Sequence, residues 1–103
     1  MQIANFINGE FVPPRSGEYF DDINPATAEV IARIPDSDEG DVDDAVRAAK
    51  AAFPAWSRMP AAERSNLLLK LADLIEQNLD ELARSESIDN GKTLTLAKSV
   101  TVE

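Results

Sequence analysis

The sequence contains neither cysteine nor histidine. Without cysteine the chain forms no disulfide and offers no thiolate nucleophile, and without histidine it lacks the commonest zinc ligand and the usual general base. No apolar run approaches the roughly 20 residues that a helix needs to span a bilayer. The first residues lack the basic-then-apolar order of a secretory signal, so we expect a cytoplasmic protein.

Basic residues are also scarce, with 10 against 19 acidic residues and a net charge of −9. An acidic surface repels phosphate backbones and anionic lipids, so we expect no nucleic-acid partner and no membrane partner. The apolar share of 44% is ordinary for a globular protein, and 103 residues suit one small domain with a modest core. The acidity is most simply a solvated surface.

Residues 1–36 are predicted to form strands and turns. Asn8-Gly9 stands between apolar pairs in 5–7 and 10–12, which is the strongest short signal for a β-hairpin. Further strands are predicted over residues 19–23 and 30–34, joined by a turn over 24–29.

The apolar spacing becomes helical after Asp38, which we expect to cap a first helix. Pro54 is predicted to end that helix, so that Trp56 lies in the connection. A second helix is expected from Pro60, with Met59 at the position of its cap.

Leucines then form a broad stripe, and Asn78 with Glu81 resembles a capping pair that starts a third helix over 79–89. Gly91 is its expected C-terminal glycine. The period of residues 94–103 favours a strand.

Three short blocks stand in fixed order: residues 23–27 (INPAT), 52–56 (AFPAW) and 89–92 (DNGK). With the helical pattern between the last two, they closely resemble the amino-terminal segment of NAD(P)-dependent aldehyde dehydrogenases, from about Asn5 to Glu103. The run from Glu86 to Val100 looks most like the dehydrogenases of 2-aminomuconic or 2-hydroxymuconic semialdehyde. Succinate-semialdehyde and betaine-aldehyde enzymes are the next nearest.

The resemblance implies an oxidoreductase that converts an aldehyde to a carboxylate with NAD or NADP. The cysteine nucleophile and the glutamate base of that family lie downstream, so this chain is expected to hold no catalytic and no cofactor-binding residue and to be inactive alone. The family forms homodimers and homotetramers, and the partner of the full enzyme would be a small aldehyde.

The implied fold class is α/β, with an N-terminal β-hairpin and short strands followed by three to four helices. Residues 1–103 would form an incomplete amino-terminal part of the NAD-binding domain, strand-rich over 1–36 and helical over 38–103. For 94–103 the resemblance favours a helix, against the period.

Asp89 is the candidate site residue. A carboxylate at a helix C-terminus is poorly placed against the dipole unless a cation is present, and carboxylate and carbonyl oxygens suit a hard cation. Resemblance to betaine-aldehyde enzymes implies a K+ or Na+ site built from Asp89, the carbonyl of Ile23, and Asp22. The alternative is a surface carboxylate or a polar contact with the Asn24 turn, and both interpretations stay open.

The remaining motifs do not indicate a functional site. Gly91-Lys92-Thr93 lacks the earlier glycine of a P-loop, since Glu86 holds that position, and no dinucleotide fingerprint occurs. Ala28 stands where the family's turn usually has glycine, at a cost of about 1 kcal/mol if that position needs positive φ. Uncovered leucines predict a chain that is loosely packed or self-associated alone. The alternative function is a non-catalytic acidic binding or assembly module that keeps this fold.

Overall fold

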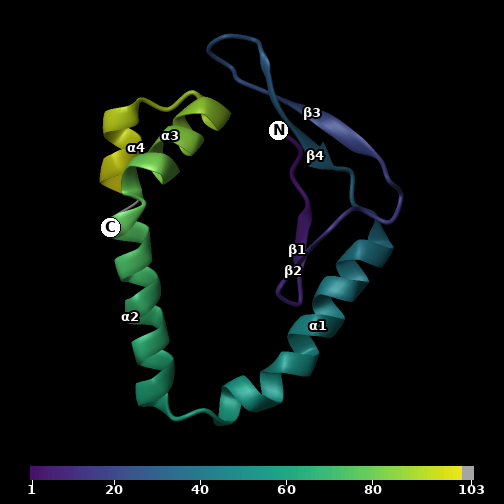
Figure 1. Ribbon diagram of the computed structural model, residues 1–103, viewed down its shortest axis with the longest axis vertical. Helices are drawn as coiled ribbons and strands as arrows, with labels where there is room; N and C mark the ends of the chain where they lie inside the picture. Colours follow the sequence, from purple (N-terminus) through teal and green to yellow (C-terminus); the bar gives the residue numbers. More distant parts are fainter. Residues whose placement is uncertain (101–103) are drawn as a thin grey trace. The chain divides into compact units, whose positions relative to one another are not determined.

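The computed structural model describes residues 1–100, and of Val100 only the backbone. The chain divides into two compact units, one made of residues 1–22 and 30–58 and the other of 23–29 and the residues from 59 onward. Figure 1 shows the order of elements, with four short strands before four helices. The expected α/β class is therefore confirmed.

The first strands, β1 (Asn5–Ile7) and β2 (Glu10–Val12), form an antiparallel hairpin in which Ile7 faces Glu10 across the ladder. Asn8 and Gly9 have φ values of 55° and 81°, the signature of a type I′ turn. The predicted hairpin is thus confirmed with its boundaries.

A second antiparallel pair of extended segments follows, β3 (Tyr19–Ile23) and β4 (Val30–Pro35), which lie side by side in a separate two-stranded sheet. The chain start joins β4, because Ile3 donates its N–H to the carbonyl of Arg33 at 3.0 Å. Ala32, in the middle of β4, is buried.

Helix α1 spans Glu39–Arg58 and runs through Pro54, so the prediction that Pro54 ends the helix is wrong. Trp56 accordingly lies within α1 and not in a connection. Proline removes one backbone donor and strains one turn, but it does not prevent the next residues from staying helical.

In the second unit, α2 (Ala61–Gln77) begins after Pro60, which occupies the N-cap with ψ 140° and offers no side-chain hydrogen bond. Met59 therefore precedes the cap, and its assignment to the cap position is wrong. Asn78 separates α2 from α3 (Leu79–Asn90), as predicted. Its side chain donates to the carbonyl of Leu74 at 2.8 Å and closes α2, so the predicted capping pair with Glu81 does not form.

Gly91 ends α3 in the left-handed region, with φ 78° and its N–H on the carbonyl of Ser87, as predicted. Helix α4 (Leu94–Val100) follows, which confirms the helix over the strand for residues 94–100. The rest of that prediction, 101–103, lies outside the described residues.

The core is small. Among the described residues the buried apolar side chains are those of alanines and of Pro14, and no large side chain is fully buried. Throughout α2 no residue is buried, and five of its leucines are 45–61% exposed: Leu67, Leu68, Leu69, Leu71 and Leu74. No helix within the described residues is both long and apolar enough to cross a membrane.

Candidate functional site

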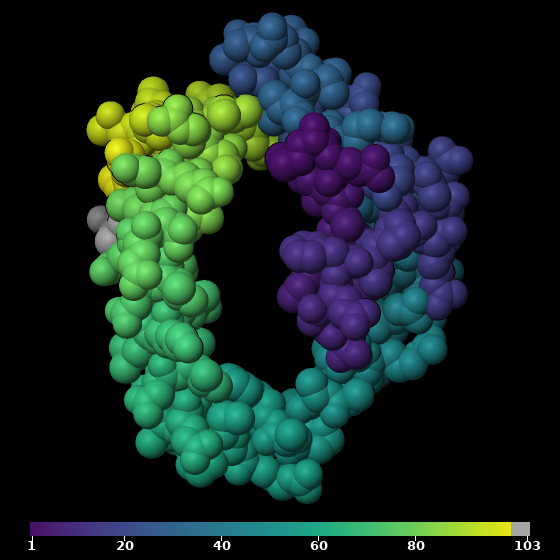
Figure 2. Space-filling view, viewed as in Figure 1, coloured from purple at the N-terminus to yellow at the C-terminus, as the bar shows by residue number. Residues whose placement is uncertain are grey.

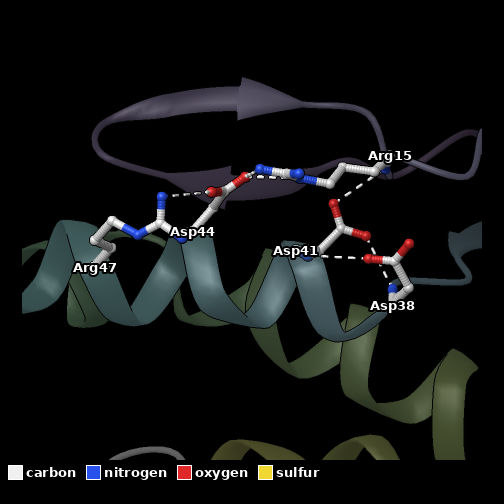
Figure 3. Close-up of polar contacts among 5 residues, drawn as sticks. All are labelled: Arg15, Asp38, Asp41, Asp44 and Arg47. Carbon is white, nitrogen blue, oxygen red and sulfur yellow. Dashed lines mark hydrogen bonds and ion pairs between the residues drawn. The ribbon is translucent and has the colours of Figure 1, made fainter.

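The N-terminus of α1 is held by two carboxylates that cap each other's backbone. The Asp41 N–H donates to Asp38 Oδ1 at 3.1 Å, and the Asp38 N–H donates to Asp41 Oδ2 at 2.9 Å. This is a capping box with aspartate in place of the usual glutamate. Figure 3 shows the pair at the start of the helix. The N-cap predicted at Asp38 is present.

Arg15, in the segment after β2, completes this cluster. Its backbone N–H donates to Asp41 Oδ1 at 3.0 Å, and its guanidinium pairs with Asp44 (Figure 3). The hydrogen bond to Asp44, and then its charge, raises the pKa of Arg15. Asp41 is 5% exposed and is the only buried charged side chain among the described residues. The cluster joins the hairpin segment to α1.

Sequence reasoning found Asp38 but not its partners. The Asp-x-x-Asp spacing was a detectable signal for Asp41, since the capping box recurs at that separation. Arg15 gave no such signal, because it lies 26 residues earlier in the chain and only the fold brings it to Asp41.

The turn between β3 and β4 is built around Asn24. Its Oδ1 accepts the N–H of Ala26 at 2.9 Å, and its backbone carbonyl accepts that of Ala28 at 2.8 Å. Ala28 takes φ 61°. This position of the turn therefore does require the left-handed conformation in which alanine is strained.

The same turn packs on the end of α3. A Cβ placed on Gly91 would lie 3.1 Å from Cγ of Pro25, so a side chain there would require the proline ring to move by a few tenths of an ångström. Ile23 and Asp89 lie two residues before these contact points and belong to the same compact unit. Asp22 belongs to the other unit.

Asp89 itself is exposed and makes no hydrogen bond or ion pair within the described part of the chain. No three acidic side chains among residues 1–100 converge as a metal cluster would require. The predicted set of Ile23, Asp22 and Asp89 therefore stays a prediction that would need carbonyl ligands and further residues.

Beside Asp89, Glu86 and Lys92 form an ion pair across the end of α3. The hydrogen bond from Lys92 lowers the pKa of Glu86, against the opposing effect of burial. Ser87 Oγ donates to the carbonyl of Lys92 at 2.6 Å, and the Lys92 N–H donates to Asn90 Oδ1 at 2.8 Å. The loop after α3 is therefore held by its own polar groups.

The start of α1 does not fit the pyrophosphate of a nicotinamide dinucleotide. Such a ligand needs a glycine-rich turn between a strand and a helix, with open N–H groups at the helix start. At Gly40, near the start of α1, a Cβ would meet Arg15 at 3.0 Å and Asp38 at 3.1 Å. The chain's own side chains fill that position, and the carboxylates of Asp38 and Asp41 would repel a pyrophosphate.

A family model described as "Aldehyde dehydrogenase family" matches residues 11–103. The chain belongs to the aldehyde dehydrogenase family. Two curated members show how close the sequence similarity is. The 2-aminomuconic semialdehyde dehydrogenase of Bos taurus is 47% identical over 102 residues, which are 99% of this chain and 20% of that protein. The acetaldehyde dehydrogenase of Pseudomonas aeruginosa is 52% identical over 91 residues, or 88% of this chain and 18% of that protein.

Solved structures share the fold as well. PnpE in complex with nicotinamide adenine dinucleotide superposes with a TM-score of 0.93 at 45% identity, covering 97% of this chain and 20% of that one. The chain thus spans about a fifth of the length of the relatives it matches. The family and the fold are therefore shown for a segment that corresponds to about a fifth of these relatives.

Proposed function

We propose that this chain is the amino-terminal part of an NAD(P)-dependent aldehyde dehydrogenase that oxidises an aldehyde to a carboxylate. The agreement of the family match over residues 11–103 with a fold at TM-score 0.93 carries the proposal. The chain has no cysteine, so the nucleophile of the family reaction would come from residues beyond it. These residues would serve as the strand-rich (1–36) and helical (38–103) beginning of an incomplete NAD-binding domain.

The nicotinamide cofactor, NAD or NADP, would be held by other parts of the protein. The carboxylates at the start of α1 and the side chains beside Gly40 support that division, because the carboxylates would repel a phosphate and the side chains would crowd it. When bound, the cofactor would accept hydride from the substrate, and this segment would support the domain around it.

A semialdehyde is the proposed substrate class. Four 2-aminomuconic semialdehyde dehydrogenases at 45–48% identity support it. The acetaldehyde dehydrogenase, at 52% identity over a shorter stretch, makes a short unbranched aldehyde the competing choice. A cytoplasmic homodimer or homotetramer is the proposed state of the full enzyme.

The test is NAD(P)H formation by the protein at its natural length in the source. Muconic semialdehydes, succinate semialdehyde and acetaldehyde are compared with NAD and with NADP, and the 103-residue chain alone serves as the control. We expect the highest kcat/KM with a semialdehyde and no turnover by the chain alone. A protein of 11.2 kDa in its source would contradict the proposal. It would favour the binding or assembly module, which the exposed leucines of α2 would suit.

We also propose that Asp89 and the carbonyl of Ile23, with Asp22, contribute to a K+ or Na+ site of the full enzyme. The contact of Pro25 with Gly91 supports this, since it ties the turn after Ile23 to the helix end that carries Asp89. The carboxylate of Asp89 has no protein partner among the described residues.

The full enzyme and its Asp89→Ala variant are melted in potassium, sodium and tetramethylammonium chloride at equal ionic strength. We expect the melting temperature of the parent to depend on the cation and that of the variant not to. Asp73→Ala, which removes an exposed carboxylate in α2, is the matched control. Equal responses of Asp89→Ala and the parent would rule out the cation role.

A further inference from the structure

The chain contains two Asn-Gly pairs, Asn8-Gly9 and Asn90-Gly91. Asparagine before glycine is the dipeptide most prone to lose its side-chain amide, because glycine leaves the following backbone nitrogen unshielded. That nitrogen must be free of hydrogen bonds and must reach Cγ of the asparagine. The two pairs are identical in sequence, so their structural environments decide which one reacts.

Asn90-Gly91 is locked at the end of α3. The Gly91 N–H, which would supply the attacking nitrogen, donates to the carbonyl of Ser87 at 3.0 Å. The Asn90 side chain accepts the Lys92 N–H at 2.8 Å and contacts Glu86 at 3.5 Å. Attack would break the helix end and its left-handed cap together.

Asn8-Gly9 is held by nothing but the hairpin turn. Both residues are exposed, and within residues 1–100 neither the Asn8 side chain nor the Gly9 N–H makes a hydrogen bond. A Cβ at Gly9 would meet nothing within 4 Å, so the turn is open on that side. The hairpin is visible at the surface, in purple, in Figure 2.

The strands that flank this turn have three residues each, and a two-stranded hairpin of that size is marginally stable. The Phe6 and Phe11 rings on one face of the hairpin meet at 5.0 Å, but they are 64% and 77% exposed. Local opening of the turn therefore costs much less than opening a helix end, and opening lets the nitrogen of Gly9 reach Cγ of Asn8.

We propose that Asn8 is a site of spontaneous deamidation and that Asn90 is protected. The backbone nitrogen of Gly9 loses its proton to solvent and attacks Cγ of Asn8, forming the N–Cγ bond of a succinimide. The Cγ–Nδ2 bond breaks, and Nδ2 takes up a proton from solvent and leaves as ammonia. Water then adds to one of the two ring carbonyls and opens the ring to aspartate or isoaspartate. Water is the only co-reactant and no electron is transferred.

The product changes the hairpin. Isoaspartate carries the main chain through its former side chain and lengthens the backbone by one carbon, in a turn that holds Ile7 opposite Glu10. A two-residue type I′ turn has no room for that extra atom, so the register of the hairpin is lost. Each event also adds one negative charge to a chain that already carries −9.

The experiment ages the protein at its natural length, in its folded state and at mildly alkaline pH, and follows the mass gain of its tryptic peptides. Cleavage after Arg15, Arg84 and Lys92 puts Asn8 in peptide 1–15 and Asn90 in peptide 85–92. We expect the gain at Asn8 to be at least about tenfold faster than at Asn90, since each 1.4 kcal/mol of extra opening energy is a factor of ten. The same incubation in concentrated urea should bring the two rates close together.

Two variants serve as controls. Asn8→Asp should remove the mass gain from peptide 1–15, and Gly9→Ala should slow it by shielding the nitrogen. Fragmentation separates Asn8 from Asn5, whose side chain is bonded to Ser37 at 2.9 Å. Equal rates at Asn8 and Asn90 in the folded protein, or a faster rate at Asn90, would overturn the proposal.

Discussion

At the residue scale, Ala28 holds a left-handed conformation that residues other than glycine rarely adopt, with φ 61°. This costs about 1–2 kcal/mol, of which glycine would recover part because it also gains freedom in the unfolded chain. We expect Ala28→Gly to raise the free energy of unfolding by roughly 0.5–1 kcal/mol. Urea unfolding measures it. Ala26→Gly, in the same turn but without positive φ, should destabilise, and a gain there would contradict the argument.

A side chain at Gly91 would meet the same left-handed backbone strain and, in addition, a close contact with Pro25. Gly91→Ala meets both φ 78° and Pro25 at 3.1 Å, whereas Gly17→Ala meets φ 72° and nothing within 4 Å. We expect Gly17→Ala to cost about 1 kcal/mol and Gly91→Ala clearly more. The difference between the two losses in unfolding free energy measures the contact with Pro25. Equal losses would show that the turn and the helix end do not touch.

Glu86 makes the stability of the fold depend on pH at acid pH. Its pKa is lowered from 4.5 by Lys92, so the unfolded state binds its proton at a higher pH than the folded state does. The stability from this pair is complete above pH 4.5 and is lost as the pH falls through the folded pKa. Glu86→Gln should therefore show a weaker decline of stability over that window. Glu63→Gln, at an exposed position of α2, is the control and should keep the decline of the parent.

At the scale of elements, the buried carboxylate of Asp41 connects α1 to the segment after the hairpin. It accepts the backbone N–H groups of Arg15 and Asp38. In Asp41→Asn, one of the two acceptor oxygens becomes an NH2 group. The backbone N–H that faces this NH2 group then has no acceptor. We expect a loss of about 1.5–3 kcal/mol, against less than about 0.5 kcal/mol for the exposed Asp43→Asn. Thermal and urea unfolding of both variants decide it, and similar small losses would show that the cluster is not a structural link.

At the scale of the whole molecule, burial is too sparse for an independent domain. Apolar burial supplies most folding free energy, and here the buried apolar side chains among the described residues are those of alanines and of Pro14, while the leucines of α2 stay exposed. We expect the 103-residue chain alone to self-associate and to melt broadly. Light scattering and a melt at several concentrations test this, with Leu68→Glu as a variant that weakens association. A sharp melt of a monomer, independent of concentration, would contradict it.

Local chemistry determined much of this protein from sequence alone. Asn8-Gly9 dictates its own turn, the 3.6-residue period places the helices, and Gly91 ends α3, because each depends on neighbours within a few residues. The family also followed from ordered local blocks. The local preference of Pro54 is overridden, because a proline weakens one turn of a helix and the residues after it stay helical in α1.

Only tertiary structure brought Arg15 to Asp41 and Pro25 to Gly91. These contacts join residues 26 and 66 positions apart, and no local pattern encodes such a pairing. The helix over 94–100 is a similar case, since its alternating period favours a strand but its position after the glycine cap, against α3, makes it helical. Packing against distant residues can outweigh a weak local preference, which is why the sequence by itself left that stretch open.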